Sequence, residues 1–471
     1  MIAKSIFGPP GTGKTTRALG IIESIVASGV DPKAVSFLSF TRAAAGEALK
    51  RMGLKKSDNV STLHSLCYRL MRLSPQVVMD TPKLKIFCED AGIDMGFTSY
   101  DSTEYDAYLS MVNLSRNAMI DLDEAYVRSG GVGSLSELYL FSDMYSRWKS
   151  TYGAVDYDDM LSGVLDNRLF PRVSHIMVDE AQDLTPLQWK VIDQFSSHKN
   201  IKEVYICGDD DQALYTWAGA DAHGMKKFED RFCGKREVLS QSYRVPKSVH
   251  SIAMDIINRV PDRVEKEYKP RDHDGTVEMA GEVDVSSFIT NAAPFMVIGR
   301  TNYVLGKVAA ELRENGVSYT WNGEGGAWRR DAGLSIRVWK KLQNGEDISQ
   351  REMNVVSKVL TMGAKKAINR KDPTVFKKSW DEVMVLPPEA MEQIEVHGEE
   401  SLTEAPNVEL CTVHAAKGRE CENVILLTDM TERVRESMDS DPDSEARVFY
   451  VGVTRAISNL TIVGACDGYP I

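Results

Sequence analysis

Residues 2–15 read IAKSIFGPPGTGKT, a short apolar run followed by a glycine-rich loop, and the residues after them have helical spacing. This order of strand, glycine loop and helix is the context that the pattern G-x-x-x-x-G-K-[ST] requires. Glycines allow backbone N–H groups and the helix N-terminus to wrap a triphosphate. We therefore predict that Lys14 reaches the β- and γ-phosphates of ATP and that Thr15 binds Mg²⁺. The predicted loop comprises Gly8, Pro9, Pro10, Gly11, Thr12, Gly13, Lys14, Thr15 and Thr16.

Further apolar runs, many of them ending in polar or acidic residues, recur along the chain and alternate with helical stretches such as TRAAAGEALKRMG and TNYVLGKVAAELRENG. Buried strands that alternate with helices predict an α/β fold with parallel, doubly wound sheets. Functional residues of such sheets gather at the carboxyl ends of the strands. The predicted strands lie within 2–7, 34–40, 174–183, 202–212, 236–244, 276–280, 294–300, 407–418, 422–430 and 460–465.

The 471 residues are enough for more than one hydrophobic core, and two stretches interrupt the alternation. We predict a first domain from 1–83 and 156–245 that carries a helical insertion at 84–155. The second domain is predicted from 246–344 and 406–471, with a helical, basic insertion at 345–405. Seven Lys or Arg residues and one Asp lie within 353–378, and this segment either touches nucleic acid or is a solvated helix face.

Composition excludes several classes of protein. Hydrophobic residues make up 43% and charged residues 26%, as in globular proteins, and no apolar run reaches the roughly 18 residues of a membrane span. The N-terminus lacks the apolar core of a signal peptide. Seven cysteines without a C-x-x-C pair and eight unclustered histidines argue against disulfides or zinc, so we expect a cytoplasmic protein. A net charge of −12 argues against coating nucleic acid over the whole surface and leaves room for a local basic groove.

Acids at a strand end supply the second half of an ATPase site. In IMVDEAQD, Asp179 is placed to hold the Mg²⁺ shell and Glu180 to orient and deprotonate water. Phosphoryl transfer also needs positive charge opposite the γ-phosphate. Arg244 in LSQSYR and Arg455 in FYVGVTRA are the two candidates, although a lone arginine is more often in a surface salt bridge.

Ten motifs in one order now identify a family resemblance: GPPGTGKT, FLSFTRAAAGE, STLHS, DYDDML, VDEAQD, GDDDQALYTWAGA, LSQSYR, IGRTN, TVHAAKGRE and RVFYVGVTRA. Together they resemble the UvrD/PcrA/Rep family of superfamily 1 DNA helicases. The resemblance implies two RecA-like P-loop domains, 1A and 2A, with a helical insertion 1B and a reduced insertion 2B. It also implies ATP bound between the two domains, single-stranded DNA bound across both, and 3′→5′ translocation.

The resemblance assigns further roles by position. It implies that Gln182 and Gln212 sense the γ-phosphate, that Tyr243 stacks on adenine, and that Glu420 contacts ribose. Arg244 and Arg455 correspond to the two arginine fingers. Aromatic stacking is worth roughly 1–3 kcal/mol per base and tolerates any sequence. The implied DNA-contacting residues are Phe40, Thr41, Arg42, Thr62, His64, Tyr215, Trp217, Arg300, Asn302, Thr412 and His414.

The chain also departs from the family pattern. Only seven residues precede Gly8, so the family's adenine-reading glutamine motif is not in this sequence, and we expect looser nucleotide selectivity that rests on Tyr243. Thr216 and Ala218 stand where the family usually has arginines, and Leu63 occupies a position where the family has a phenylalanine. Fewer cationic contacts predict weaker and less salt-sensitive DNA binding.

The leading hypothesis is an ATP- and Mg²⁺-dependent 3′→5′ single-stranded DNA translocase and helicase. One alternative is a translocase that displaces proteins from DNA without appreciable unwinding, which a short 2B region favours. Another is a non-catalytic DNA-binding scaffold. The expected partners are single-stranded DNA and junctions with duplex, with no membrane, and the chain is expected to be a monomer or weak dimer.

Overall fold

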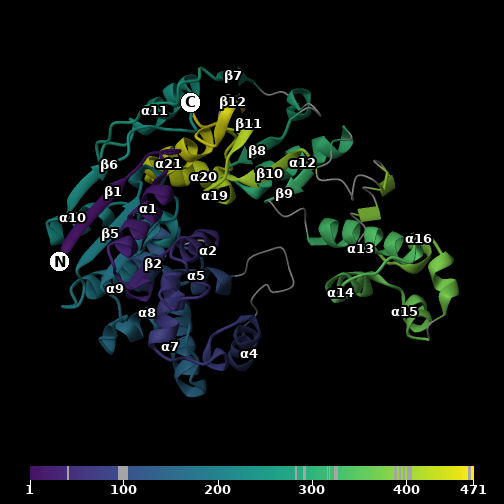
Figure 1. Ribbon diagram of the computed structural model, residues 1–471, viewed down its shortest axis with the longest axis horizontal. Helices are drawn as coiled ribbons and strands as arrows, with labels where there is room; N and C mark the ends of the chain where they lie inside the picture. The colour runs from purple at the N-terminus through teal and green to yellow at the C-terminus, as the bar shows by residue number, and fades with distance from the viewer. Residues whose placement is uncertain are drawn as a thin grey trace. The chain divides into compact units, whose positions relative to one another are not determined.

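The chain forms two units around two parallel sheets (Figure 1). Unit 1 comprises Met1–Arg244 and Val260–Pro270, and unit 2 comprises Val245–Arg259 and Arg271–Ile471. The computed structural model describes residues 1–39, 42–93, 104–281, 284–289, 293–315, 317, 319–322, 327–370, 372–386, 390–391, 394–395, 398–399, 406–464 and 468–471.

Unit 1 has a six-stranded sheet in the order β3-β2-β4-β5-β1-β6, and every neighbouring pair is parallel. Phe7 pairs with Gly208 and Val178 with Ile206, so three central strands end at one edge of the sheet. The loops after these strands therefore lie close together. The strands are β1 (Ile2–Phe7), β2 (Val35–Leu38), β3 (Val60–Ser61), β4 (His175–Val178), β5 (Glu203–Gly208) and β6 (Lys235–Val238).

Helices cover both faces of this sheet, because alternate residues of each buried strand point to opposite faces. On one face Ile6 and Phe37 pack with apolar residues of α1 (Lys14–Ala27) and α2 (Arg42–Arg51). On the other face Val178 and Ile206 pack with four helices. These are α3 (Leu63–Leu70), α8 (Tyr157–Asp166), α9 (Pro186–Ser196) and α10 (Gly224–Phe232).

The predicted insertion of unit 1 is helical and has its own aromatic core. Phe87 contacts the rings of Phe141 and Tyr145 edge-on, with ring centroids 5.8 and 5.3 Å away. Such a core lets the insertion pack as a separate layer of the unit. Its helices are α4 (Thr81–Ala91), α5 (Glu104–Ala118), α6 (Leu122–Arg128) and α7 (Leu135–Tyr152).

Unit 2 repeats the architecture with a parallel sheet in the order β7-β12-β11-β8-β10-β9. Its strands are β7 (Thr276–Ala280), β8 (Phe295–Gly299), β9 (Tyr319–Trp321), β10 (Val408–Thr412), β11 (Cys421–Leu427) and β12 (Ala456–Val463). The helices that follow or flank them are α11 (Lys247–Ile257), α12 (Asn302–Glu314), α19 (Val413–Ala416), α20 (Glu432–Ser440) and α21 (Pro442–Val453). The predicted α/β fold with two parallel sheets is confirmed. The sequence prediction missed β3 and β9, which have two and three residues.

The insertion of unit 2 begins earlier than predicted. Its core includes Ile336 and Trp339, which lie on the helix before position 345 and are fully buried among residues such as Val356 and Val383. That helix therefore belongs to the insertion and not to the sheet domain. The insertion's helices are α13 (Ala327–Gln343), α14 (Gln350–Val359), α15 (Met362–Asn369) and α16 (Trp380–Val383).

A second difference concerns Val260–Pro270, which the prediction placed in the second domain. The structure assigns this segment to unit 1. Its bonds to unit 1 explain the assignment: Lys269 N–H donates to the carbonyl of Ser240, and the Tyr268 hydroxyl donates to the carbonyl of Pro10. The chain thus passes from unit 1 to unit 2, returns for eleven residues, and leaves again.

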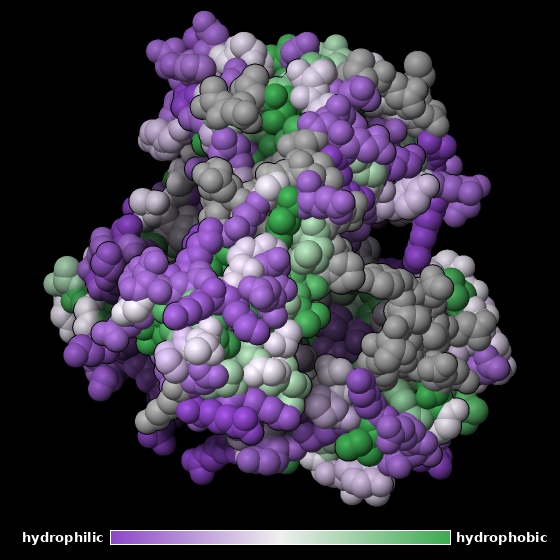
Figure 2. Space-filling view, turned by 90° about the vertical axis from the view of Figure 1, so that its right-hand side faces the viewer, coloured by the Kyte–Doolittle hydropathy of each residue, from purple (hydrophilic) through white to green (hydrophobic). Residues whose placement is uncertain are grey.

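Figure 2 shows one face of the molecule, on which hydrophilic side chains predominate and hydrophobic ones are scattered among them. Within the described part of the chain, none of the helices combines the length and the apolar character that crossing a membrane requires.

Candidate functional site

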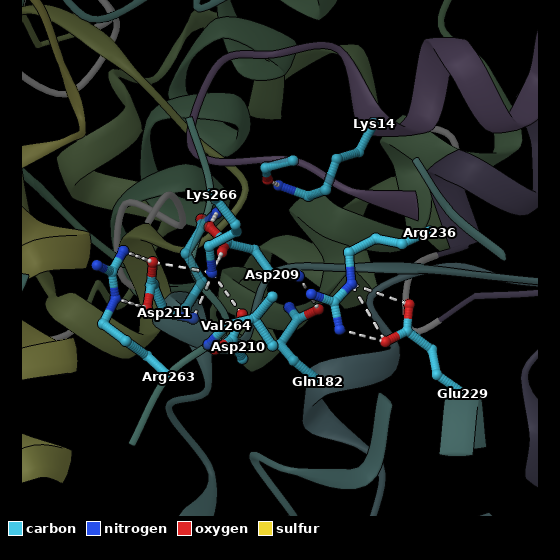
Figure 3. A network of polar contacts seen from close by, with 12 residues as sticks. Lys14, Gln182, Asp209, Asp210, Asp211, Glu229, Arg236, Arg263, Val264 and Lys266 are labelled. Atoms are coloured by element: carbon cyan, nitrogen blue, oxygen red, sulfur yellow. Dashed lines mark hydrogen bonds and ion pairs between the residues drawn. The ribbon is translucent and has the colours of Figure 1, made fainter. Parts of the chain in front are cut away.

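The glycine-rich loop connects β1 to α1 and curls over its own backbone. Gly11 and Gly13 have φ of 75° and 79°, which a glycine adopts without strain. The Lys14 Nζ donates to the carbonyl of Gly8 at 2.6 Å, so the ammonium lies across the loop (Figure 3). No side chain of the described residues caps the N-terminus of α1, and its first turn has no acid. The first N–H groups of this helix therefore form a site suited to phosphate.

Thr15 and Asp179 form a pair suited to a divalent cation. The Thr15 hydroxyl donates to Asp179 Oδ2 at 3.0 Å, and Asp179 lies directly after β4 with 1% of its surface exposed. The other carboxylate oxygen, Oδ1, is buried with no hydrogen-bond partner in the described structure. Burial, with the charge of Glu180, raises the pKa of Asp179 to about 7. A hydroxyl and one under-compensated carboxylate fit Mg²⁺, which takes few protein ligands and keeps several waters.

Glu180 is held by a buried amide. It has a left-handed φ of 55°, and its carboxylate accepts a hydrogen bond from Gln182 Nε2 at 2.6 Å. Gln182 is fully buried, and its Oε1 accepts from the backbone N–H of Asp209 at 3.0 Å. A Cβ at Gly208 would lie 2.4 Å from this Oε1, so the close approach requires glycine. The loop after β4 and the loop after β5 are thereby joined.

The loop after β5 also carries Gln212, and the loop after β6 brings Tyr243 and Arg244 to the glycine-rich loop. Gln212 lies in the short helix η4 (Asp210–Gln212), and its Nε2 donates to Asp209 Oδ2 at 2.6 Å. The Tyr243 N–H donates to the carbonyl of Gly11 at 2.8 Å, and its side chain is 74% exposed. A Cβ on Gly11 would lie 2.5 Å from the Cβ of Arg244. Unit 1 therefore gathers the predicted nucleotide residues of all these loops.

A groove of about 1450 Å³ lies on unit 1 and is lined by Thr62, His64, Tyr157 and Asp179 among others. Thr62 caps α3 by accepting from the Ser65 N–H. The His64 ring contacts Tyr157 edge-on at 5.6 Å between centroids, and burial lowers the pKa of His64. The groove thus joins two predicted DNA-contacting residues to the strand-end acid of the nucleotide site.

The predicted stacking residues follow η4 closely. Trp217 lies in the short helix η5 (Thr216–Ala218) with 68% of its surface exposed, and Tyr215 is half-buried. Trp217 is therefore presented to solvent in a manner suited to stacking. Phe40 and Thr41 lie outside the described residues, and Arg42 begins α2 with its side chain also outside them.

In unit 2, the two predicted arginines are bonded within the unit. Arg455 is 1% exposed and donates from Nε to the carbonyl of Val451 at 2.9 Å and from a terminal nitrogen to that of Arg419 at 3.2 Å. Arg300 forms a bidentate pair with the buried carboxylate of Glu445, at 2.8 and 2.6 Å. Neither arginine is presented as a simple exposed cation.

The remaining candidates of unit 2 lie at the starts of helices or just beside one. Asn302 is the first residue of α12, Thr412 caps α19 through the Ala415 N–H, and His414 is in that helix. Glu420 directly follows Arg419, whose carbonyl accepts from Arg455. The carboxyl ends of β8 and β10 thus carry Arg300 and three of these remaining candidates, Asn302, Thr412 and His414.

The sequence prediction missed Lys266 and Arg263, which pair with the acids after β5 (Figure 3). Their only sequence signal is two basic residues three apart, RVEK, after an apolar helix. Such a pair is common on helix surfaces and could not have been distinguished from a solvated face.

A glycine-rich loop before a helix, a hydroxyl–carboxylate pair beside it and a parallel sheet define a P-loop nucleoside triphosphatase site. Comparison with known families sharpens this class. The sequence model of the UvrD/REP helicase N-terminal domain matches residues 4–233, and that of the UvrD-like helicase C-terminal domain matches residues 386–466. The chain belongs to the UvrD/Rep-like helicase family.

Curated relatives agree with this assignment. The chain is 25% identical over 279 residues to the ATP-dependent DNA helicase Rep of Buchnera aphidicola, an alignment of 54% of this chain and 40% of that protein. It is 26% identical over 298 residues to the ATP-dependent DNA helicase PcrA of Staphylococcus aureus, covering 55% of this chain and 38% of that protein. The chain therefore covers less than half the length of either relative.

Proposed function

We propose that the chain is an ATP- and Mg²⁺-dependent translocase on single-stranded DNA that moves 3′→5′ and separates duplex strands. The observation that carries the proposal is the joined set of loops in unit 1: Thr15 is bonded to Asp179, and Glu180 is bonded through Gln182 to the loop that bears Gln212. The family and its named relatives support the substrate class, since both relatives are described as ATP-dependent DNA helicases.

Each side chain of the nucleotide site has a defined task in this proposal. The Lys14 ammonium leaves the Gly8 carbonyl to bind the β- and γ-phosphates, and Tyr243, which is exposed, stacks on adenine. Thr15 and Asp179 would hold Mg²⁺, which neutralises charge that develops on the phosphates. Glu180 orients the attacking water and accepts its proton, while Gln182 keeps the carboxylate in place.

Arg244 and Arg455 supply positive charge at the γ-phosphate, and Glu420 contacts the ribose. Arg455 must first exchange its bonds to the carbonyls of Val451 and Arg419 for a phosphate oxygen. Because buried guanidinium bonds are costly to break, we propose that this exchange occurs only when ATP is bound. Arg455 would then report the nucleotide state to unit 2.

DNA binding is coupled to the nucleotide through a single loop. Gln212, at the γ-phosphate, is separated by only four residues from Trp217, which is exposed for stacking on a base. A shift of η4 on hydrolysis therefore displaces the ring. The groove lined by Thr62 and His64 would hold neighbouring nucleotides. The other candidates for DNA contact are Phe40, Thr41, Arg42, Tyr215, Arg300, Asn302, Thr412 and His414.

The test uses the purified chain. ATP hydrolysis is measured with and without oligothymidine, and unwinding is measured on duplexes with a 3′ or a 5′ tail. We expect hydrolysis that DNA stimulates and unwinding from 3′ tails. Glu180→Gln should retain ATP binding and lose about 10²–10⁴-fold in kcat.

Other outcomes would contradict the proposal. Unwinding from 5′ tails alone would overturn the polarity. Hydrolysis and displacement of a bound protein from single strands, without unwinding, would favour the protein-displacing translocase. A wild-type chain that binds DNA and hydrolyses no ATP would indicate the non-catalytic scaffold.

A further inference from the structure

Three consecutive acids after β5 form a buried ionic cluster with two basic residues of Val260–Pro270 (Figure 3). Lys266 Nζ lies 2.9 Å from Asp209 Oδ1 and 2.9 Å from Asp211 Oδ2, and it also contacts Asp210. Arg263 makes a bidentate pair with Asp211, at 2.8 and 2.5 Å. The cluster joins residues that are 52–57 positions apart in the chain.

The cluster is almost fully removed from water. Asp209 and Asp211 are 0% exposed, Asp210 is 4% exposed, and the Lys266 side chain is 0% exposed. Burial alone would lower the pKa of Lys266, but the charges of the three acids outweigh it and raise the pKa, so the ammonium stays charged. Burial likewise acts to raise the pKa of Asp209, and Lys266 and Lys14 outweigh it, so Asp209 stays ionised. Lys266 thus contacts all three carboxylates of the cluster, and Arg263 is a second cation on Asp211.

Asp209 connects this cluster to the groups proposed to hydrolyse ATP. Its carboxylate accepts from Gln212 Nε2, and because a carboxylate only accepts, the orientation of the Gln212 amide is determined. Its backbone N–H donates to Gln182 Oε1, which turns Gln182 Nε2 toward Glu180. Two hydrogen bonds therefore separate the backbone of Asp209 from the proposed general base.

The segment that carries Lys266 has an unusual place in the chain. Both Val245–Arg259 before it and Arg271–Ile471 after it belong to unit 2. Within unit 1 the segment also reaches the glycine-rich loop, since the Tyr268 hydroxyl donates to the carbonyl of Pro10 at 3.1 Å. Displacement of unit 2 thus has a covalent route to the loops that hold the nucleotide.

We propose that Lys266 is a positioning residue for hydrolysis: by holding Asp209 it sets Gln212 and, through Gln182, Glu180. The inference rests on the proposed ATPase function and deepens it, because it states how Glu180, the proposed general base for the attacking water, is held in position.

Arg236 provides a matched control on the same unit. Its guanidinium lies 5.1 Å from the Phe7 ring centroid, and Lys266 lies 5.9 Å from the same centroid. Arg236 donates to Glu229, which is 7% exposed, and Figure 3 shows this pair beside the cluster. Its side-chain bonds in the described structure go to Glu229 and not to Asp209. Arg236→Met therefore removes a nearby ion pair without touching the link to Glu180, although the Arg236 side chain is 40% exposed and that of Lys266 is 0% exposed.

The experiment compares the full-length wild type with Asp210→Asn, Lys266→Met/Asp210→Asn, Arg236→Met and Gln182→Met. The double substitution removes one negative and one positive charge, so the net charge of the cluster is kept. The readouts are kcat and KM for ATP with saturating oligothymidine, together with ATP affinity at equilibrium. We expect the double variant to lose at least tenfold in kcat relative to Asp210→Asn, with KM and ATP affinity changed less than twofold. Arg236→Met should keep kcat within twofold of wild type.

Gln182→Met breaks the link while leaving the ionic cluster intact, so it tests the second half of the inference, the connection from Asp209 to Glu180, even if the double variant does not fold. Its kcat should also fall at least tenfold with unchanged ATP affinity. A kcat within twofold of the reference for either variant would overturn the inference alone. An equal loss in Arg236→Met would overturn it too, because general destabilisation would then explain the effect. A wild-type chain without ATPase activity would instead overturn the proposed function.

Discussion

Replacing Asp158 with Asn should stabilise unit 1 at neutral and alkaline pH. Asp158 lies on α8 with 6% of its surface exposed, and Asn117 Nδ2 donates to its Oδ1 at 2.9 Å. Burial is the largest cause that raises the pKa of Asp158 to about 6; Arg116 opposes it, and Asp156 adds to it. An Asn has the same shape, keeps the oxygen that accepts from Asn117, and carries no charge.

The magnitude follows from proton linkage. Asp158 has a pKa of about 6 in the folded chain and 3.8 as an ordinary aspartate. Between these values the folded state binds more protons than the unfolded state, so stability falls as pH rises. At 1.36 kcal/mol for each pH unit, the loss reaches about 3 kcal/mol above pH 7. Asp158→Asn removes this loss, so its advantage should be absent near pH 4 and complete by pH 7–8.

The assay is scanning calorimetry of wild type and variant at several pH values. For a unit of this size, about 3 kcal/mol corresponds to an increase in Tm of about 6 °C at pH 8. Asp159→Asn is the neighbouring control: it loses ion pairs with Arg116 and Lys149, at 2.5 and 2.6 Å, and should lower Tm at that pH. An Asp158→Asn gain that is the same at pH 5 and pH 8, or no gain at pH 8, would refute the reasoning.

Two further substitutions test the nucleotide and DNA sites. Trp217→Ala should weaken binding of a fluorescent oligothymidine by about 5- to 150-fold, the equivalent of 1–3 kcal/mol of stacking. Tyr152 is another exposed aromatic residue, and Tyr152→Ala should leave the affinity for this oligonucleotide unchanged. Unchanged affinity in Trp217→Ala would exclude stacking at Trp217. Gly11→Ala should abolish ATP binding by calorimetric titration, because the new Cβ would lie 2.5 Å from that of Arg244 at a φ of 75°. Gly29 also has a positive φ, and its Cβ position is open, so Gly29→Ala should cost about 1 kcal/mol of stability and leave ATP binding intact. ATP binding by Gly11→Ala at wild-type affinity would show that the loop backbone can adjust to the added Cβ.

The parts that were predictable from sequence are those encoded by short contiguous patterns. The glycine-rich loop is predictable because its strand, glycines and Lys14 lie within fifteen residues, and β4 with its acids is predictable for the same reason. Gln212 and Trp217 lie within the single stretch GDDDQALYTWAGA, but the sequence did not predict the short helices η4 and η5 that carry them. Strands of two or three residues were not predictable, because they are too short to show alternation.

The roles of many charged residues could be read only from the folded chain. The family resemblance assigned Arg300 to DNA contact, and only the fold showed that it pairs with the buried Glu445, 145 positions away. The placement of α13 in the helical insertion likewise depended on where Trp339 is buried.

By itself the sequence determined the fold class, the nucleotide loop and the strand-end acids, because hydrophobic period and local spacing are properties of neighbouring residues. Only the tertiary structure decided that Val260–Pro270 returns to unit 1 and that Lys266 and Arg263 pair with the acids beside Gln212. The physical reason is that burying a charge costs desolvation free energy, which a partner of opposite charge offsets. Whether such a partner is present depends on where the fold brings the two side chains together and not on their distance in sequence.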